Sequence, residues 1–355
     1  MSMLSIFVVL LGIGISVLIS ELQFEDNNIN FDYNEIPCME IHSSFKLFEE
    51  EVSGAESMAY VGDGKIISGM ADGRVMELDI YKNTAKTLYK LKNSRPLGIK
   101  LINRTILGIA DGKLGFYFYN LETKQREFFI KEGDFIDNLP VLFLDDFAYS
   151  PKRNMLYISQ VSVKFSFNDD VSLIMHGGLN GRILTYDLSA KKVSALAPKF
   201  AFPNGIEIDK DEKYLFVNEF QRFTTHKYDL NTNTLSKFAV FSGHPDNIRS
   251  DGFDGFWIAM YSANKRNLYY LEKYPIVRFI VYQLLEFKLM PRRALITPYG
   301  SFVHVNEFGE IDKCFYSSDG KAFNQVSEVF QYNGMLFIGS FYDKVDYIAQ
   351  IKDFS

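Results

Sequence analysis

The sequence has little of what several enzyme classes need. It has five histidines but no zinc-type cluster of them, and it contains neither a Gly-x-Ser-x-Gly elbow nor a phosphate-binding glycine loop. It therefore gives no support to a zinc enzyme, a serine hydrolase or a nucleotide-binding protein. Basic residues are sparse too: 38 Lys and Arg stand against 44 Asp and Glu, and the densest basic clusters are Lys265-Arg266 and Arg292-Arg293. We expect no nucleic-acid partner, since nucleic-acid-binding surfaces are basic.

Charge is absent from the N-terminus. The first 20 residues carry none, and the first basic residue is Lys46. The apolar stretch from Met3 to Ile19 is long for a signal-peptide core and marginal against the roughly 20 residues of a spanning helix. We expect residues 1–20 to form a hydrophobic helix that acts as a signal-anchor, with a cleaved signal peptide as the alternative, and residues 21–43 to be a linker. The protein would be a single-pass membrane protein with its remaining part in the lumen or outside the cell, or it would be secreted.

Cysteine is scarce, with only Cys38 and Cys314 in the chain. In an oxidising compartment these two could form a disulfide between the start of the main domain and its last third. Two independent buried thiols are an equal alternative, because sequence does not say whether their α-carbons come within bonding range. The same compartment would allow glycosylation of Asn103, which begins the sequon Asn103-Arg104-Thr105.

Aromatic residues and short apolar runs are abundant. The chain has 33 Phe and 21 Tyr but a single Trp, and its Ile-, Val-, Phe- and Tyr-rich runs are broken by turns such as Gly62-Asp63-Gly64, which is typical of β-strands. Six comparable strand-turn-strand units begin at Gly64, Arg104, Asn154, Lys213, Gly255 and Gly334. Their spacing of roughly 40 to 80 residues favours a propeller over a solenoid. We predict an all-β, six-bladed β-propeller over residues 44–355, closed by pairing of the segment from Ile41 to Phe48 with the last unit.

One stretch departs from the β pattern. Between Pro275 and Pro291 the residues are strong helix formers and are apolar on most faces. We expect a short helical excursion in the region of the fifth to sixth blade. Such a helix could pack on the outer surface of a blade, act as a lid over the ring, or contact a membrane.

Four oxygen-bearing side chains share one position relative to these units. They stand eight or nine residues ahead of a strand-turn-strand signal, and they are Glu56, Asp146, Asn204 and Asn247. In a ring of blades this common phase places all four at the same end of equivalent strands, where they converge on the axis. Converging carboxylates and amides indicate a site for a hard metal ion. Taken singly, each has a simpler interpretation: Asn204 and Asn247 could form turns, and Glu56 could be a solvated surface residue.

The sequence resembles the strictosidine synthase-like family, most closely its adipocyte plasma membrane-associated protein branch, with paraoxonases as more distant relatives. The motifs that carry the resemblance are GAESMAY from Gly54, RPLGIK from Arg95, GRILTYDL from Gly181, FPNGIEIDKDEKYLFVNE from Phe202, GHPDNIRSD from Gly243 and VSEVFQYNGMLFIGSF from Val326. Their order and spacing cover the chain from Ser44 to about Ile351. The resemblance implies a six-bladed propeller, usually with an N-terminal membrane anchor in the animal branch.

The resemblance to paraoxonases implies a calcium ion in the channel. Carried over by position, its ligands become Glu56, Asp145, Asn204, Asp246 and Asn247. Only Asp145 departs from the pattern, because that family has Asn there, and the change keeps an oxygen ligand. Three carboxylates so close together would repel one another, so that a cation or protons must accompany them.

The catalytic residues of the relatives are not all present. The first histidine of the paraoxonase pair aligns with Leu97, and His176 and His244 lie elsewhere, so Asp145 or Asp146 is the predicted general base. The catalytic glutamate of plant strictosidine synthases aligns with Ser327, and the neighbouring Glu328 is expected on the opposite face of its strand. Only a register shift would bring Glu328 into the channel, so alkaloid condensation is not expected.

We therefore predict a calcium-dependent hydrolase that acts on small-molecule aryl esters or lactones. The metal would polarise the carbonyl, and an activated water would attack it. The alternative is a non-catalytic binding or adhesion propeller that calcium stabilises.

Overall fold

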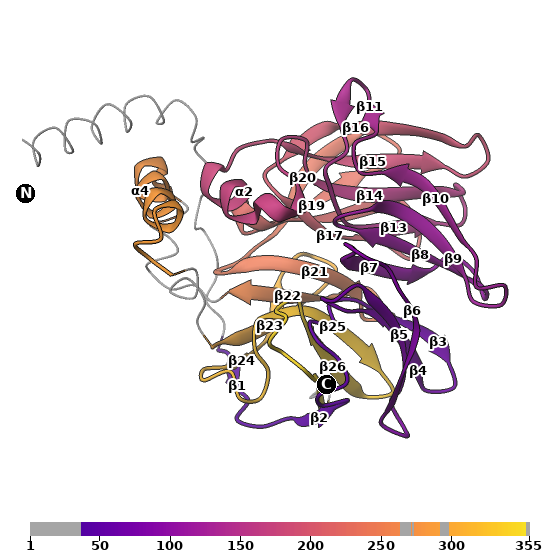
Figure 1. The fold of residues 1–355 in the computed structure, drawn as a ribbon, viewed down its shortest axis with the longest axis vertical. Coiled ribbons are helices and arrows are strands. Elements are labelled where there is room, and N and C mark those ends of the chain that lie inside the picture. Colours follow the sequence, from indigo (N-terminus) through magenta and orange to yellow (C-terminus); the bar gives the residue numbers. More distant parts are fainter. Residues whose placement is uncertain (1–36, 263–270, 272, 292–297, 353–355) are drawn as a thin grey trace, which may run out of the picture.

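The computed structural model describes residues 37–262, 271, 273–291 and 298–352. The predicted N-terminal helix at 1–20 and most of the predicted linker at 21–43 lie outside these residues. Six sheets surround a common axis (Figure 1), and the fold is the all-β, six-bladed β-propeller that the sequence predicts. The first strand of each blade is the innermost, and neighbouring first strands contact one another from the first blade to the sixth.

The blades follow one another along the chain. The first blade contains β3 (Met58–Gly62), β4 (Lys65–Gly69), β5 (Arg74–Asp79) and β6 (Thr84–Lys90). The second contains β7 (Pro96–Leu101), β8 (Ile106–Asp111), β9 (Gly115–Asn120) and β10 (Arg126–Lys131). The third contains β13 (Phe143–Ser150), β14 (Met155–Ser162), β15 (Gly181–Asp187) and β16 (Lys192–Phe200). The fourth blade contains β17 (Pro203–Ile208), β18 (Tyr214–Glu219), β19 (Thr224–Asp229) and β20 (Thr234–Val240). The fifth contains β21 (His244–Ser250), β22 (Phe256–Ser262), β23 (Gly300–Val305) and β24 (Ile311–Ser317). The sixth contains β25 (Val326–Tyr332), β26 (Met335–Ser340) and β27 (Ile348–Lys352). A small hairpin of β11 (Phe135–Ile136) and β12 (Leu139–Pro140) projects after the second blade.

The sixth blade contains both ends of the domain. Strand β2 (Phe45–Leu47) pairs antiparallel with β27, so that the chain start supplies the outer strand of the last blade, in the segment where the sequence predicted ring closure. Strand β1 (Met39–Glu40) adds to the fifth blade by parallel pairing with β24. A disulfide joins Cys38 to Cys314 of β24, with their α-carbons 4.5 Å apart. Pairing and disulfide together attach the start of the domain to two blades.

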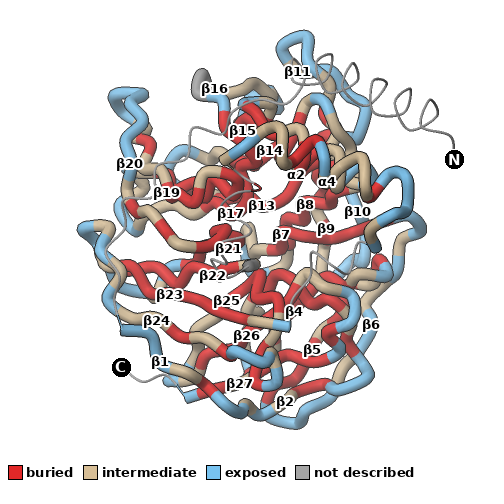
Figure 2. Tube along the Cα trace, turned by 90° about the vertical axis from the view of Figure 1, so that its left-hand side faces the viewer, coloured by how far each residue is buried: buried red, intermediate tan, exposed pale blue. Residues whose placement is uncertain are grey.

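The core lies between neighbouring blades, because alternate side chains of each strand face the next sheet. Between the first two blades, for example, Ile67 and Val75 pack with Ile99, Leu107 and Tyr117, all inaccessible to solvent. Figure 2 shows the same pattern around the ring: the inner strands are buried along most of their length, and exposure concentrates in the outermost strands and in the turns at the rim.

Two helices leave the β pattern and pack together. Helix α4 (Pro275–Glu286) falls in the predicted segment and is inserted between β22 and β23 of the fifth blade. Helix α2 (Asp170–His176), with the 3-10 turn η1 (Phe167–Asp169) before it, is inserted between β14 and β15 and was not expected from the sequence. A further 3-10 turn, η2 (Phe220–Arg222), links β18 to β19. Figure 1 shows α4 beside α2, and the buried Arg278 of α4 donates a hydrogen bond to the Met175 carbonyl.

Within the described residues, no helix combines the length and the apolar character needed to cross a bilayer.

Candidate functional site

The inner strands share an irregularity at one end. In β13 the register advances from Leu144 to Phe147 while the partner β14 moves only from Gln160 to Ile158, so that β13 has an extra residue there. Comparable shifts occur at the same end of the other inner strands of the second to sixth blades, between Pro96 and Gly98, Pro203 and Ile206, Pro245 and Ile248, and Val326 and Glu328. Such bulges redirect side chains, and they are enriched next to active sites.

The predicted ligand residues lie in or beside these bulges. Asp145, Asn204, Asp246 and Asn247 fall within the irregular segments of β13, β17 and β21, and Glu56 precedes β3. We call these five the candidate ligands. Each has an exposed fraction of 2–4 %, with Glu56 and Asn247 at 2 % and Asn204 at 4 %. All except Asn247 line one cavity of about 140 Å³ at this end of the ring.

Two glycines let the inner strands come this close. A β-carbon on Gly98 would lie 2.7 Å from the Asp146 α-carbon, and one on Gly205 would lie 2.6 Å from the Asn247 α-carbon. Real β-carbons do not approach other atoms so closely, so only glycine fits at either position. Gly98 and Gly205 belong to the RPLGIK and PNG motifs, and their role is to bring neighbouring blades together at the candidate ligands.

Several candidate ligands have buried oxygens without a hydrogen-bond partner. They are the Oδ1 atoms of Asp145, Asn204, Asp246 and Asn247. Buried polar atoms are normally hydrogen-bonded, so unpartnered oxygens at one end of a channel indicate a missing cation or water. Oxygens of carboxylates and amides are what a calcium ion binds, and the donor set therefore fits that ion. No three His, Cys, Asp or Glu side chains in the described part of the chain are already arranged around a single metal position, so the fit lies in the oxygen types and their lack of partners.

The electrostatics of the cavity also fit a divalent cation. Three of the candidate ligands are carboxylic acids: Glu56, Asp145 and Asp246. Among the described residues, their one ion pair with a base joins Glu56 to the buried Arg95, whose Nη2 lies 3.2 Å from the Glu56 carboxylate. Three ionised carboxylates against one guanidinium leave two negative charges.

Without a cation, burial favours the protonated forms of these acids. Burial raises the pKa of Glu56 to about 7; Arg95 opposes this rise and Asp146 adds to it. Burial and the neighbouring Glu56 hold the pKa of both Asp145 and Asp246 well above its ordinary range. A bound cation would reverse these shifts.

Asp146, predicted as a base or outer ligand, lies in a different environment from Asp145. Its Oδ2 accepts hydrogen bonds from Arg249 Nη1 at 2.6 Å and from the Ile206 amide at 3.1 Å. Burial alone would raise its pKa, but the cations of Arg249 and Lys100 hold the pKa below its ordinary value. Asp146 is not among the residues that line the cavity, whereas Asp145 is. The bulge thus separates two adjacent aspartates into two layers of the channel.

Glu328 contradicts the expectation that it faces away from the channel. It is fully buried, and its Oε1 accepts a hydrogen bond from Arg249 Nε at 2.9 Å. The reason is the register shift at Ser327, which changes the alternation of side chains along β25. Burial, against the attraction of Arg249, raises the pKa of Glu328 to about 7. A carboxyl group therefore lies near Ser327 after all, although within an ion pair.

Neither of the two histidines that the sequence singled out lines the cavity. The His244 ring lies between the rings of Phe220 and Phe223, with centroid distances of 4.4 and 4.5 Å. The His176 Nδ1 lies 2.8 Å from the Ser172 carbonyl oxygen in α2. Both positions are those of packed structural residues.

The walls of the cavity are largely apolar, and besides the candidate ligands the charged residue that lines it is Asp170 of α2. Leu173 and Ile174 of α2 line it together with six aromatic residues, Phe143, Phe167, Phe202, Phe220, Tyr261 and Phe341. Helix α2 is fixed in this place by Gln221, whose side-chain amide donates to the Ile174 carbonyl, and by its contacts with α4. No residue of α4 lines the cavity, so α4 supports the wall from behind.

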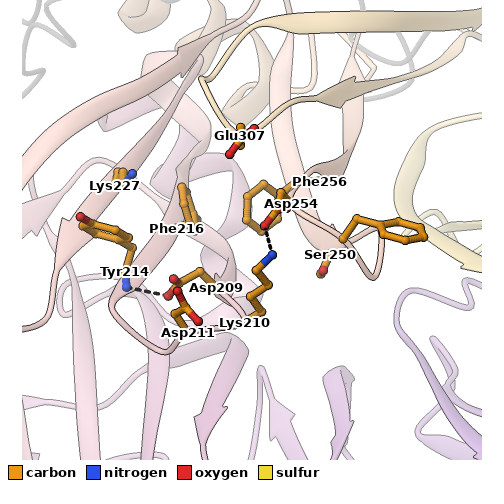
Figure 3. Close-up of a pocket in the computed structure, with 11 residues that line it drawn as sticks. Asp209, Lys210, Asp211, Tyr214, Phe216, Lys227, Ser250, Asp254, Phe256 and Glu307 are labelled. Carbon is orange, nitrogen blue, oxygen red and sulfur yellow. Dashed lines mark hydrogen bonds and ion pairs between the residues drawn. The ribbon is translucent and has the colours of Figure 1, made fainter.

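A second cavity of about 140 Å³ lies at the opposite end of the inner strands, between the turns that follow β17 and β21 (Figure 3). Its charged groups are largely paired: Lys210 forms an ion pair with Asp254, and Lys227 lies 3.8 Å from the centroid of the Tyr214 ring. None of its lining side chains has a buried polar atom without a partner. This cavity offers no counterpart to the unpartnered oxygens of the first.

Three features of the site were missed from the sequence. Arg95 and Arg249 both lie in motifs that carry the family resemblance, but neither was given a role. Arg249 could have been predicted to face the channel, because residues two apart in a strand share a face and the predicted ligand Asn247 lies two residues before it. Helix α2 left no such signal, since its seven residues interrupt a β pattern only briefly.

Comparisons with known proteins agree with the fold and the resemblance. Residues 145–233 match the family model described as strictosidine synthase. The adipocyte plasma membrane-associated protein of Gallus gallus is 26% identical over 329 residues, which cover 86% of this chain and 77% of that protein.

Among solved structures, regucalcin from Agrobacterium tumefaciens, described as a calcium-binding protein, superposes with a TM-score of 0.61 and 12% identity, covering 89% of this chain and 95% of that one. A gluconolactonase from Xanthomonas campestris gives a TM-score of 0.60 with 10% identity, covering 86% and 88%. At these identities the two structures show the shared fold.

Proposed function

We propose that this propeller is a calcium-dependent hydrolase of aryl esters or lactones. The matches to known proteins support the strictosidine synthase-like family, as the motifs predicted. The observation that carries the proposal is the set of unpartnered buried oxygens of Asp145, Asn204 and Asp246 in a largely apolar cavity, with that of Asn247 beside them. Glu56 completes the set of residues that would hold the ion.

The bound ion would polarise the substrate carbonyl and stabilise the developing oxyanion. The chain's own residues supply the remaining functions. Asp145 faces the cavity and is the better-placed acceptor for a proton from water, because Asp146 is held in ion pairs with a lowered pKa. Arg95 donates from Nη2 to the Glu56 carboxylate and holds it in place. The aromatic walls exclude water and favour a substrate with an aryl or alkyl group over a polyhydroxylated one.

The named activities of structural neighbours are consistent with this proposal. One neighbour is described as a gluconolactonase and another as a calcium-binding protein. The second candidate is a non-catalytic propeller in which the ion is structural, and the observation in its favour is that no histidine is among the described residues that line the cavity.

The two candidates differ in what chelation and one substitution do. We would measure hydrolysis of an aryl acetate and of an apolar γ-lactone with and without a calcium chelator, in the wild type and in Asn204→Ala. The matched control is Asn324→Ala, since Asn324 lies outside the cavity and accepts a hydrogen bond from the Tyr299 amide. The hydrolase proposal expects turnover that is lost on chelation and in Asn204→Ala, with the fold intact. If chelation lowers the melting temperature and neither substrate is cleaved at any calcium concentration, the structural role is correct and the hydrolase is refuted.

We also propose that residues 1–20 attach the protein to a membrane, with the propeller on the lumenal or extracellular side. The relative from Gallus gallus is named a plasma membrane-associated protein. Asn103, the proposed glycosylation site, is exposed in the turn between β7 and β8. Extraction of the full chain from membranes at alkaline pH, with and without glycosidase treatment, tests both points. Release of an unglycosylated protein would contradict them.

A further inference from the structure

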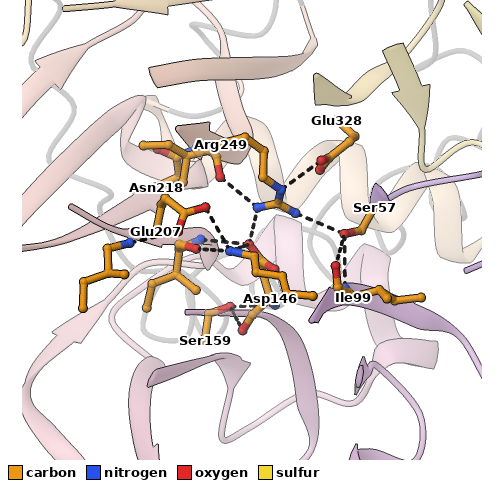
Figure 4. Close-up of polar contacts among 12 residues, drawn as sticks. Ser57, Ile99, Asp146, Ser159, Glu207, Asn218, Arg249 and Glu328 are labelled. Atoms are coloured by element: carbon orange, nitrogen blue, oxygen red, sulfur yellow. Dashed lines mark hydrogen bonds and ion pairs between the residues drawn. The ribbon is translucent and has the colours of Figure 1, made fainter. Parts of the chain in front are cut away.

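A second polar layer lies directly below the candidate ligands, centred on Arg249 of β21. Its guanidinium donates from Nη1 to Asp146 at 2.6 Å, from Nε to Glu328 at 2.9 Å and from Nη2 to the Ser57 hydroxyl at 3.2 Å (Figure 4). These partners come from the third, sixth and first blades, whereas Arg249 belongs to the fifth. One side chain thus links four blades near the axis.

The partners of Arg249 extend the connection to the remaining two blades. The Ser57 hydroxyl accepts a hydrogen bond from the Ile99 amide of the second blade at 3.1 Å. Asp146 accepts one from the Ile206 amide of the fourth blade at 3.1 Å. Lys100 of the second blade lies 3.6 Å from Asp146 and donates to the Ile206 carbonyl at 2.8 Å. All six inner strands therefore meet in this group of contacts, which we call the Arg249 network.

Four members of the Arg249 network lie one or two residues from a candidate ligand along the chain. Ser57 follows Glu56, Asp146 follows Asp145, Ile206 lies two residues after Asn204, and Arg249 lies two after Asn247. Fixing the network therefore fixes the backbone on which the ligands stand. The structure assigns Arg249 the role of a positioning residue: we propose that its guanidinium holds the bulged strands so that the candidate ligands converge on one divalent cation.

Arginine suits this role for two reasons. Its planar fork donates in several directions at once, whereas a lysine ammonium is a compact charge that does not match two carboxylates and a hydroxyl in fixed directions. It also balances charge, because Asp146 and Glu328 are both buried: without Arg249, Glu328 would lose its ion pair and Asp146 would keep only Lys100, at 3.6 Å. The proposal rests on the proposed calcium site and adds the residue that sets its geometry.

The test measures calcium affinity by titration calorimetry in the full-length protein, at a temperature where each variant is folded by circular dichroism. Arg249→Lys keeps the charge and loses the fork. The matched control is Arg182→Lys, because Arg182 is also buried and donates to Gln160 and to two backbone carbonyls, but forms no ion pair among the described residues. We expect Arg249→Lys to weaken calcium binding about 10- to 100-fold, and Arg182→Lys to leave it within about twofold. The double variant Arg249→Met with Glu328→Gln, which removes one charge of each sign, should weaken binding similarly.

Each outcome has a distinct meaning. If the wild type binds no calcium, the proposed function fails first. If the wild type binds calcium and the folded Arg249→Lys protein binds it equally well, the positioning role is refuted while the proposed function survives. Equal loss in Arg182→Lys would also refute it, since the effect would then follow from any buried arginine. If both Arg249 variants remain unfolded even with calcium, Arg249 holds the propeller together rather than positioning the ligands, and the proposal fails.

Discussion

Removing divalent cations should make the stability of this protein fall as pH rises from 5 to 8. In the cation-free state burial raises the pKa of Glu56 from its ordinary value of 4.5 to about 7. Between these values the native state keeps a proton that the unfolded state has lost. Stability decreases with pH wherever the native state binds more protons, so the decline begins near pH 4.5 and is complete above pH 7.

The size of this effect follows from the shift. A difference of about 2.5 pKa units at 1.36 kcal/mol each gives about 3 kcal/mol for Glu56 alone. For a domain of roughly 300 residues, with an unfolding entropy of about 2.1 cal/mol/K per residue, this corresponds to about 5 °C in melting temperature. The pKa values of Asp145, Asp246 and Glu328 are raised as well and add to the loss in the same direction. Saturating calcium should abolish most of the dependence, because the bound cation replaces the protons.

Calorimetric melting in a calcium chelator at pH 5, 6, 7 and 8 tests this reasoning. The lowered pKa of the partly buried His176 acts in the opposite direction near pH 6, so the quantity to compare is the difference between wild type and Glu56→Gln. Between pH 5 and 8 the melting temperature of that variant should change by about 5 °C less than that of the wild type. The melting temperature of Glu77→Gln, a substitution on β5 and outside the cavity, should change as in the wild type. A melting temperature that rises with pH in the chelator, or a Glu56→Gln curve parallel to that of the wild type, would refute the reasoning.

Three further predictions follow from the packing. Gly98→Ala places a β-carbon 2.7 Å from the Asp146 α-carbon, so we expect a loss of about 1–3 kcal/mol in urea denaturation; an unchanged midpoint would show that the strands can separate there. Replacing both Cys38 and Cys314 by Ser removes a cross-link that spans 276 residues and should lower stability by about 2–5 kcal/mol, which thermal melting against the oxidised wild type would check; equal melting temperatures would contradict it. Leu173→Gln puts an amide into the apolar wall of the cavity and should raise KM for an aryl acetate more than it changes kcat; equal KM values would mean that α2 does not contact the substrate.

Much of the fold could be read from the sequence because its signals are local. Alternating apolar residues and turn glycines gave the six strand units, and the helix after Pro275 was visible as a run of helix formers. The closing strand followed from the need to cover sheet edges. The common phase of Glu56, Asp146, Asn204 and Asn247 predicted their end of the ring, since equivalent positions of equivalent strands meet around an axis. It did not reveal that Asp146 meets Arg249 while Asp145 lines the cavity.

The remaining features depend on contacts between residues far apart in the chain. The sequence left open whether Cys38 and Cys314 pair, since their distance is set by the pairing of β1 with β24. It put Glu328 on the wrong face, because a bulge at Ser327 is decided by how β25 meets β26 and its neighbours. The sequence by itself thus determined the repeated strands and the carboxylate and amide side chains at their ends. Only the tertiary structure decided which of those oxygens face the cavity and which meet Arg249, because side-chain direction in a bulged strand is fixed by the blades packed around it.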